Sequence, residues 1–209
     1  MAALIELRVL ELLNARLCHE LVSPVGAINN GVELLDDEDP EFIRDAIKLI
    51  GQSARKAGQK LQFYRFAYGT AAAASTGGSG ASNGRELTLG LLEGGKVRCD
   101  WSPEAAALPV LWQRLACNMV VLASEALPRG GELTVRPLGA AGVEVAASGD
   151  SVNVAAELRT ALDPAIAVAE LTSRSVHAYF AARLAAELGG KLLLAEIGPQ
   201  RVVLHAAAS

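Results

Sequence analysis

The stretch ARLCHELVSPVGAINNG (residues 15–31) places a histidine and a glutamate, His19 and Glu20, in a largely apolar run with helical spacing. Apolar residues recur every three to four positions through this run, which is typical of one buried stripe along a helix. The same pattern extends from Leu10 to Leu35. It predicts one long first helix that needs a partner to cover its stripe.

A second helix is predicted directly after the acidic turn DDEDP at residues 36–40. Pro40 suits the first turn of a helix, and acidic side chains there complement the positive end of the helix dipole. The apolar pattern then resumes from Glu41 to about Tyr68. The two helices form an antiparallel hairpin. Since one hairpin buries too little of either stripe, we expect two copies to pair as a dimeric four-helix bundle.

The chain divides after the second helix. Residues 69–84, GTAAAASTGGSGASNG, lack apolar periodicity and are typical of a flexible linker. We therefore expect a helical-hairpin domain at residues 1–70, a linker at 71–84 and a second domain at 85–209. In the second domain, strands are predicted near residues 96–101, 132–137, 142–147, 191–197 and 201–207, and helices near 85–93, 109–127, 153–162 and 172–188. The fold class is α+β, with helices layered over a mixed sheet.

Composition narrows the class of partner. The 209 residues carry 19 Lys and Arg against 23 Asp and Glu, a net charge of −4, so we expect no nucleic-acid partner. The cysteines Cys18, Cys99 and Cys117 form no CxxC pair, which indicates neither a disulfide framework nor a zinc site. Charges at helical spacing near the N-terminus favour neither a signal peptide nor a membrane span, so we expect a cytoplasmic protein without membrane contact.

Helical geometry directs His19 to the outer face of the first helix. His19 lies two positions from both Leu17 and Leu21, which turns it roughly 200° away from the buried stripe. A lone surface histidine usually has no role. The outer face here also carries an apolar patch, and exposed apolar patches mark contact sites. The predicted partner-docking residues are Leu12, Ala15, Arg16, Val22, Ser23 and Gly26. Contact with the second domain is the alternative explanation of this patch.

Two neighbours bear on the reactivity of His19. The adjacent Glu20 can accept a hydrogen bond from one ring N–H, which fixes the tautomer and raises the basicity of the other nitrogen. Pro24 removes one backbone hydrogen bond and kinks or loosens the helix just past the histidine. The sequence therefore predicts a mobile, exposed imidazole that acts as a nucleophile, with Glu20 orienting and activating it.

These residues carry a family resemblance. The box HELVSP (residues 19–24) resembles the phosphoacceptor box of the dimerisation domain of sensor histidine kinases. The sequence LCHELVSPVGAINNGVELL, followed by LIGQSARKAGQKLQFYRFAYG, is similar to the sequences of the ChpT family of alphaproteobacterial histidine phosphotransferases. The resemblance covers essentially the whole chain. It implies that residues 85–209 form a degenerate version of the ATP-binding domain of histidine kinases.

The nucleotide boxes of that domain are altered at several positions. Asn118 matches the first Asn of the kinase box, but Leu122 replaces its metal-coordinating Asn and offers no oxygen to Mg²⁺. Ala147 replaces the adenine-reading Asp, and Ser175 and His177 occupy glycine positions of the phosphate-binding loop. We therefore expect this chain to bind no cofactor or metal of its own. We interpret His177 as structural.

The resemblance implies a phosphorelay intermediate of two-component signalling. His19 would take a phosphoryl group from the receiver domain of a hybrid histidine kinase and pass it to response regulators that control the cell cycle. The receiver would supply the aspartate and the Mg²⁺. Two alternatives stay open. An active ATP-dependent histidine kinase would require an intact Mg²⁺ ligand and glycine-rich loop, and a dimeric scaffold would bind receivers without phosphorylation of His19.

Overall fold

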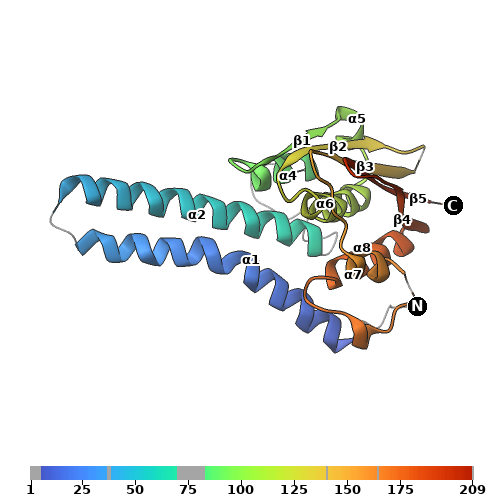
Figure 1. Cartoon of the computed structure of the whole chain (residues 1–209), viewed down its shortest axis with the longest axis horizontal. Helices are drawn as coiled ribbons and strands as arrows, with labels where there is room; N and C mark the ends of the chain where they lie inside the picture. The colour runs from blue at the N-terminus through green and yellow to red at the C-terminus, as the bar shows by residue number, and fades with distance from the viewer. Residues whose placement is uncertain (1–5, 37–38, 70–82, 140, 164, 209) are drawn as a thin grey trace.

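The computed structural model describes residues 6–36, 39–69, 83–139, 141–163 and 165–208. Helices α1 (Leu7–Glu33) and α2 (Pro40–Tyr68) form an antiparallel hairpin whose outer half extends away from a sheet and its helices (Figure 1). The predicted helical hairpin is thereby confirmed. The predicted linker at residues 71–84 lies almost entirely outside the described residues.

The hairpin is built from clear local signals. Helix α2 starts at Pro40, and the side chain of Asp39 caps it by accepting a hydrogen bond from the Glu41 N–H at 2.8 Å. The short 3₁₀ helix η1 (Leu34–Asp36) follows α1. The two long helices approach closely at Gly31, where an added Cβ would lie 2.6 Å from Cγ1 of Ile50. A glycine is therefore needed for this close packing.

One hairpin leaves much of the apolar stripe exposed. Only Val9, Arg16, Pro24 and Gly31 are buried in α1. The exposed large apolar side chains of the outer hairpin are Val25, Val32, Leu34, Leu35, Phe42, Ile47 and Leu61. A single chain thus covers the stripe only in part. The predicted pairing of two hairpins stays a prediction.

The second half of the chain is a two-layer α+β structure. Its sheet has the order β1-β2-β3-β5-β4. Strands β1 and β2 are parallel, and the remaining pairs are antiparallel. The strands are β1 (Val97–Trp101), β2 (Gly131–Pro137), β3 (Gly142–Ser148), β4 (Gly190–Ile197) and β5 (Arg201–Ala208). The helices are α4 (Gly84–Leu92), α5 (Pro103–Ala106), α6 (Val110–Glu125), α7 (Ala156–Ala161), η2 (Val168–Glu170) and α8 (Val176–Glu187). Every strand and longer helix predicted here is confirmed to within a few residues.

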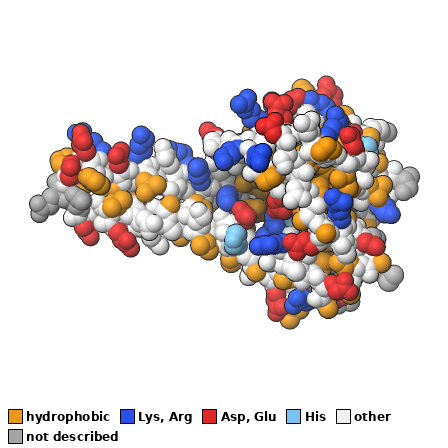
Figure 2. Space-filling model, in the orientation of Figure 1, with side chains coloured by type: hydrophobic (Ala, Val, Ile, Leu, Met, Phe, Trp, Pro, Cys, Tyr) orange, Lys and Arg blue, Asp and Glu red, His pale blue; other side chains and the backbone are white. Residues whose placement is uncertain are grey.

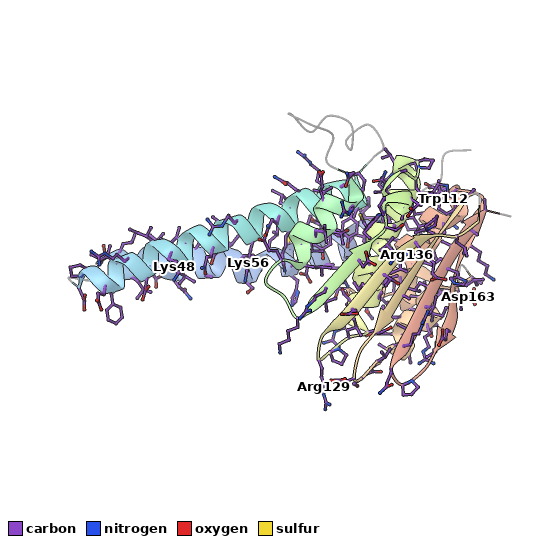
Figure 3. The ribbon with its side chains drawn as sticks, turned by 90° about the horizontal axis from the view of Figure 1, so that it is seen from above. Lys48, Lys56, Trp112, Arg129, Arg136 and Asp163 are labelled. Carbon is purple, nitrogen blue, oxygen red and sulfur yellow. The ribbon has the colours of Figure 1, made fainter. Side chains whose placement is uncertain are left out.

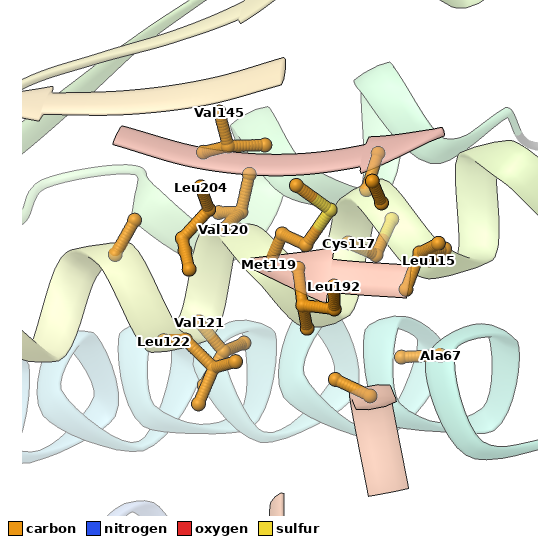
Figure 4. Packing of buried hydrophobic residues seen from close by; sticks show 14 of the residues in the cluster. Ala67, Leu115, Cys117, Met119, Val120, Val121, Leu122, Val145, Leu192 and Leu204 are labelled. Carbon is orange, nitrogen blue, oxygen red and sulfur yellow. The ribbon is translucent and has the colours of Figure 1, made fainter. Parts of the chain in front are cut away.

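Helix α6 is the centre of the core. Every residue from Trp112 to Ala123 is buried, because α6 contacts the sheet on one side and α2 on another. Figure 4 shows Val120 of α6 beside Val145 and Leu204 of the sheet. The end of α2 therefore belongs to the same core as the sheet, and residues far from α2 in sequence hold it in place.

The other face of the sheet is polar. Glu144 and His205 lie opposite each other on β3 and β5, with 2.7 Å between Oε2 and Nε2. Arg136 forms an ion pair with Asp100 on the neighbouring strand and lies on this side of the sheet (Figure 3). No helix in the described segments is both long enough and apolar enough to span a bilayer.

Candidate functional site

His19 lies where the hairpin meets the sheet domain. Its side chain is exposed, as predicted, and within the described residues it has no hydrogen-bond or ion-pair partner. It borders a cleft of about 650 Å³. The cleft is lined by Ala15, Arg16, His19, Glu20, Glu125, Asn153, Ala155, Glu157, Leu158, Ser173 and Arg174. Figure 2 shows histidine, basic and acidic side chains gathered at this junction. The imidazole is thus accessible to a second molecule.

Pro24 changes the backbone just past His19. In an α-helix the N–H of residue 24 would bond to the carbonyl of residue 20, and proline has no N–H to give. Lys60 of α2 supplies a donor instead, with its Nζ 3.0 Å from the Glu20 carbonyl oxygen. Helix α1 remains continuous through Pro24, and Figure 1 shows that it bends along its length.

The predicted contact between Glu20 and His19 is wrong in this structure. The Glu20 carboxylate accepts a hydrogen bond from Lys60 at 2.7 Å, and both side chains are less than a third exposed. Within the part of the chain that the structure describes, no hydrogen bond joins Glu20 to His19. The reason is the cross-hairpin ammonium, which binds the carboxylate more strongly than an uncharged ring would.

The predicted docking face is only partly open. Arg16 is 8% exposed, its guanidinium pairs with Glu125, and its NH1 donates to the Arg174 carbonyl oxygen at 3.3 Å. Leu12 packs against the buried core. The predicted exposure of Arg16 is wrong, because its contacts with the sheet domain cover it. Leu12 is half-buried, and docking at Leu12 stays a prediction. Ala15, Val22 and Ser23 are exposed, and Gly26 is half-buried.

Burial also acts on the acidic partner of Arg16. The pKa of the Glu125 carboxyl is raised, mainly because burial penalises its charged form, while the Arg16 guanidinium lowers it. The pair joins α1 to the end of α6. One wall of the His19 cleft is therefore fixed by an ion pair between the hairpin and the sheet domain.

Leu122 and Ala147 stand at the positions expected to correspond to the nucleotide boxes, and both lie in apolar surroundings. Leu122 lines a cavity of about 20 Å³, enclosed by Ala123, Ala126, Val154, Leu158, Leu162, Ala178, Leu194, Val202 and Leu204. Such a volume admits about one water molecule. Ala147 is fully buried on β3. Among the described residues, no group of three or more His, Cys, Asp or Glu side chains is placed to hold a metal ion.

His177 and Asn118 now connect the sheet domain to the hairpin. His177 Nε2 lies 3.0 Å from the Asn118 carbonyl oxygen, so this nitrogen carries the hydrogen. The Tyr68 hydroxyl therefore donates to His177 Nδ1 at 2.7 Å. The Asn118 side chain donates to the Ala67 carbonyl oxygen at 3.0 Å. Burial, followed by repulsion from Arg16, lowers the pKa of His177 to about 3. The structural interpretation of His177 is confirmed.

Sequence reasoning missed Lys60 and Glu125. In the sequence, Lys60 looks like an ordinary polar residue of α2, and its partner Glu20 is 40 residues away. The only available signal is the proline at position 24, which indicates that some donor must replace its missing N–H. Nothing in the sequence around Glu125 indicates that it pairs with Arg16.

Comparisons with known proteins agree with this architecture. Residues 84–199 match the family described as the histidine phosphotransferase C-terminal domain. The protein phosphotransferase ChpT of Brucella abortus (strain 2308) is 38% identical over 125 residues, which are 60% of this chain and 58% of that protein. The similarity thus spans somewhat more than half of that relative. A solved structure of a bacterial phosphotransferase shares 28% identity, with a TM-score of 0.75 and coverage of 98% of both chains. The family model matches more than half of this chain, and the chain therefore belongs to the histidine phosphotransferase family.

Proposed function

We propose that the chain is a phosphorelay histidine phosphotransferase of two-component signalling, with His19 as the phosphoacceptor. His19 carries the phosphoryl group between the receiver aspartate of a hybrid histidine kinase and the aspartates of response regulators. The observation that supports this most directly is the exposed His19 imidazole at the cleft, which has no partner among the described residues. It occurs in a chain that belongs to the family.

The chemistry requires little of this chain besides His19. One ring nitrogen of the neutral imidazole attacks the phosphorus of the aspartyl phosphate, the N–P bond forms, and the P–O bond to the aspartate carboxylate breaks. The ring then loses the proton of its other nitrogen, and transfer to the next aspartate reverses these steps. The receiver supplies the Mg²⁺ that neutralises the phosphoryl oxygens.

Transfer of this kind needs no nucleotide. The oxygen ligand and the adenine reader of the kinase boxes are replaced by Leu122 and Ala147. The cavity beside Leu122 admits about one water molecule. These observations support a function without ATP, in which the sheet domain forms part of the cleft wall.

The surface around His19 fits a receiver domain. Ala15, Val22 and Ser23 are exposed, and small or apolar residues of this kind allow a helix of a partner to approach closely. The opposite wall of the cleft carries the charged residues Glu157 and Arg174. A receiver docked here contacts both the hairpin and the sheet domain, with its aspartate directed at His19.

A second copy of the chain completes the hairpin. Val32 on α1 and Phe42 and Ile47 on α2 are each more than half exposed in the single chain. Their burial against the same face of another hairpin gives a four-helix bundle. The proposed protein is therefore a cytoplasmic homodimer with two phosphoacceptor histidines.

The test is label transfer from a panel of phosphorylated receiver domains in the absence of ATP. We expect acid-labile, alkali-stable label on the wild-type chain and none on His19→Gln. The free energy of unfolding of His19→Gln should change by less than about 0.5 kcal/mol, because the side chain is exposed. His205→Gln is the control and should be labelled normally.

A parallel incubation with labelled ATP and Mg²⁺ but no receiver, together with receiver-binding measurements, separates the two alternatives. Label from ATP with Mg²⁺ alone would favour an active histidine kinase. Stable receiver binding without label from any receiver would favour the non-catalytic scaffold. Label retained in His19→Gln would place the phosphoacceptor elsewhere.

A further inference from the structure

We propose that Lys60 is a positioning residue for His19, because its ammonium replaces the amide hydrogen that Pro24 lacks. The proposal rests on the proposed phosphotransfer at His19. It assigns to α2 a direct part in setting the geometry of the phosphoacceptor, although α2 contributes no reacting atom. The side chains involved come from residues 40 positions apart.

The first step concerns the backbone of α1. Pro24 leaves the carbonyl of Glu20 without its helical partner, and the proline ring also pushes against that carbonyl. Lys60 Nζ lies 3.0 Å from this carbonyl oxygen. The contact is partly buried, so water competes with it less than at an open surface. The lysine therefore restores the hydrogen bond that the proline removes.

The second step concerns the lysine itself. An ammonium group has three N–H donors and can serve two oxygens of one residue. Lys60 Nζ also donates to Glu20 Oε2 at 2.7 Å. The carboxylate neutralises the ammonium charge and holds it against the backbone carbonyl. Glu20 thus acts as the anchor of Lys60, which explains a glutamate beside the histidine that makes no bond to it.

The third step connects this contact to His19. The carbonyl belongs to the residue that follows His19, so its hydrogen bond to Lys60 acts on the direction of the helical segment that carries the imidazole. In-line transfer requires the reacting atoms to be aligned at roughly 3–3.5 Å, so a small change in direction lowers the rate of the chemical step. Loss of Lys60 should therefore act on transfer within the complex and much less on receiver binding.

The experiment compares Lys60→Met, Lys60→Arg and Lys56→Met in the full chain. Lys56 is the matched control, because it is exposed one turn earlier on α2 (Figure 3) and has no hydrogen-bond or ion-pair partner among the described residues. The phosphorylated receiver that labels the wild-type chain is used at increasing concentration to obtain kcat and KM.

We expect Lys60→Met to lower kcat about tenfold and to change KM less than about twofold. Lys60→Arg keeps the charged donors and should recover most of the rate, and Lys56→Met should match the wild type. A change in KM alone would overturn the proposal, because it would make Lys60 a docking residue. An unchanged kcat in Lys60→Met would also overturn it.

A second background tests the role of the proline. Pro24→Ala returns an N–H to residue 24, which can bond to the Glu20 carbonyl as in a regular helix. In this background Lys60→Met should lower kcat less than about threefold, whatever the rate of Pro24→Ala itself. An equal tenfold loss in both backgrounds would show that Lys60 acts by another route and would refute the proposal.

Hydrogen exchange gives a readout that needs no phosphotransfer. Lys60→Met should speed amide exchange in α1 around residues 20–27 about tenfold, and Lys56→Met should leave it unchanged. Absence of label on the wild-type chain would refute the proposed function, and this measurement would still decide whether Lys60 ties α1 at Pro24. Equal exchange in wild type and Lys60→Met would exclude that tie.

Discussion

Two histidines of this chain have opposite environments, and each environment fits a different role. His19 is exposed and has no partner among the described residues, whereas His177 is fully buried between Tyr68 and Asn118. A buried imidazole with both nitrogens bonded is held neutral in one tautomer. At the residue scale, burial thus separates the proposed phosphoacceptor from a structural histidine.

The buried histidine predicts how stability depends on pH. Burial lowers the pKa of His177 to about 3 from its ordinary value of 6.5. The unfolded chain therefore binds a proton near pH 6.5 that the folded chain refuses, and stability falls as the pH falls from 6.5 toward 3. When the pH is lowered from 7 to 5, the free energy of unfolding of the wild type should fall by about 2 kcal/mol more than that of His177→Gln.

Urea unfolding at pH 7, 6 and 5 measures this difference. Only the change with pH is compared, since His177→Gln lowers the stability at every pH by altering a packed site. Parallel curves for the two proteins would mean that His177 takes up its proton in the folded state.

At the scale of elements, the hairpin depends on close contact between α1 and α2. A Cβ on Gly31 would lie 2.6 Å from Ile50 Cγ1 and 3.3 Å from the Ala46 carbonyl oxygen. A Cβ on Gly58 would meet no atom within 4 Å. The two glycines share a helical environment and differ in the space beside them.

This difference predicts that the same substitution stabilises the chain at Gly58 and not at Gly31. Gly58→Ala should raise the free energy of unfolding by about 1 kcal/mol, because alanine favours the helix. Gly31→Ala gains the same preference but forces the helices apart, so it should be less stable than Gly58→Ala by about 1–3 kcal/mol. Thermal or urea unfolding of both variants gives the comparison. Equal stabilities would show that Ile50 moves aside without cost.

Helices, strands and the outward direction of His19 could be predicted because they follow from local periodicity. The covered part of α1 could not be predicted in this way. Arg16 shares the face of His19, and only the position of the sheet domain decides that Arg16 is buried while Val22 stays exposed. The Glu20 contact failed for a similar reason, since its partner Lys60 comes from the other helix.

At the scale of the whole molecule, several contacts join the hairpin to the sheet domain. The start of α1 is held by Arg8, whose NH2 donates to the Leu171 carbonyl oxygen at 3.2 Å. Farther along α1, Arg16 pairs with Glu125. The end of α2 is held through Tyr68. These contacts hold the part of the hairpin that precedes His19 along α1 against the sheet domain, beside the cleft.

The Arg16 pair predicts a test of this attachment. Arg16→Met should lower the free energy of unfolding by about 3 kcal/mol, at the low end for a buried pair because Glu125 keeps a third of its side chain exposed. Arg16→Met with Glu125→Leu should recover most of this loss, since no charge is left unpaired.

The exposed pair on the sheet provides the control. Arg136→Met breaks the pair with Asp100, which is mostly exposed, and should change the stability by less than about 1 kcal/mol. Urea unfolding of the four proteins measures these values. An Arg16→Met chain as stable as Arg136→Met would show that the buried pair contributes nothing to the attachment.

The ties at the start of α1 and at the end of α2 also have a kinetic consequence. Because the Arg16 pair and the Tyr68 contact hold the cleft in place, a receiver that docks as proposed meets a surface already in its final shape. Little conformational entropy is then lost on encounter, and the association rate is governed by diffusion, by orientation and by the charges on the cleft wall. Under the proposed function, the chain would exchange successive receivers without changing its own shape between them.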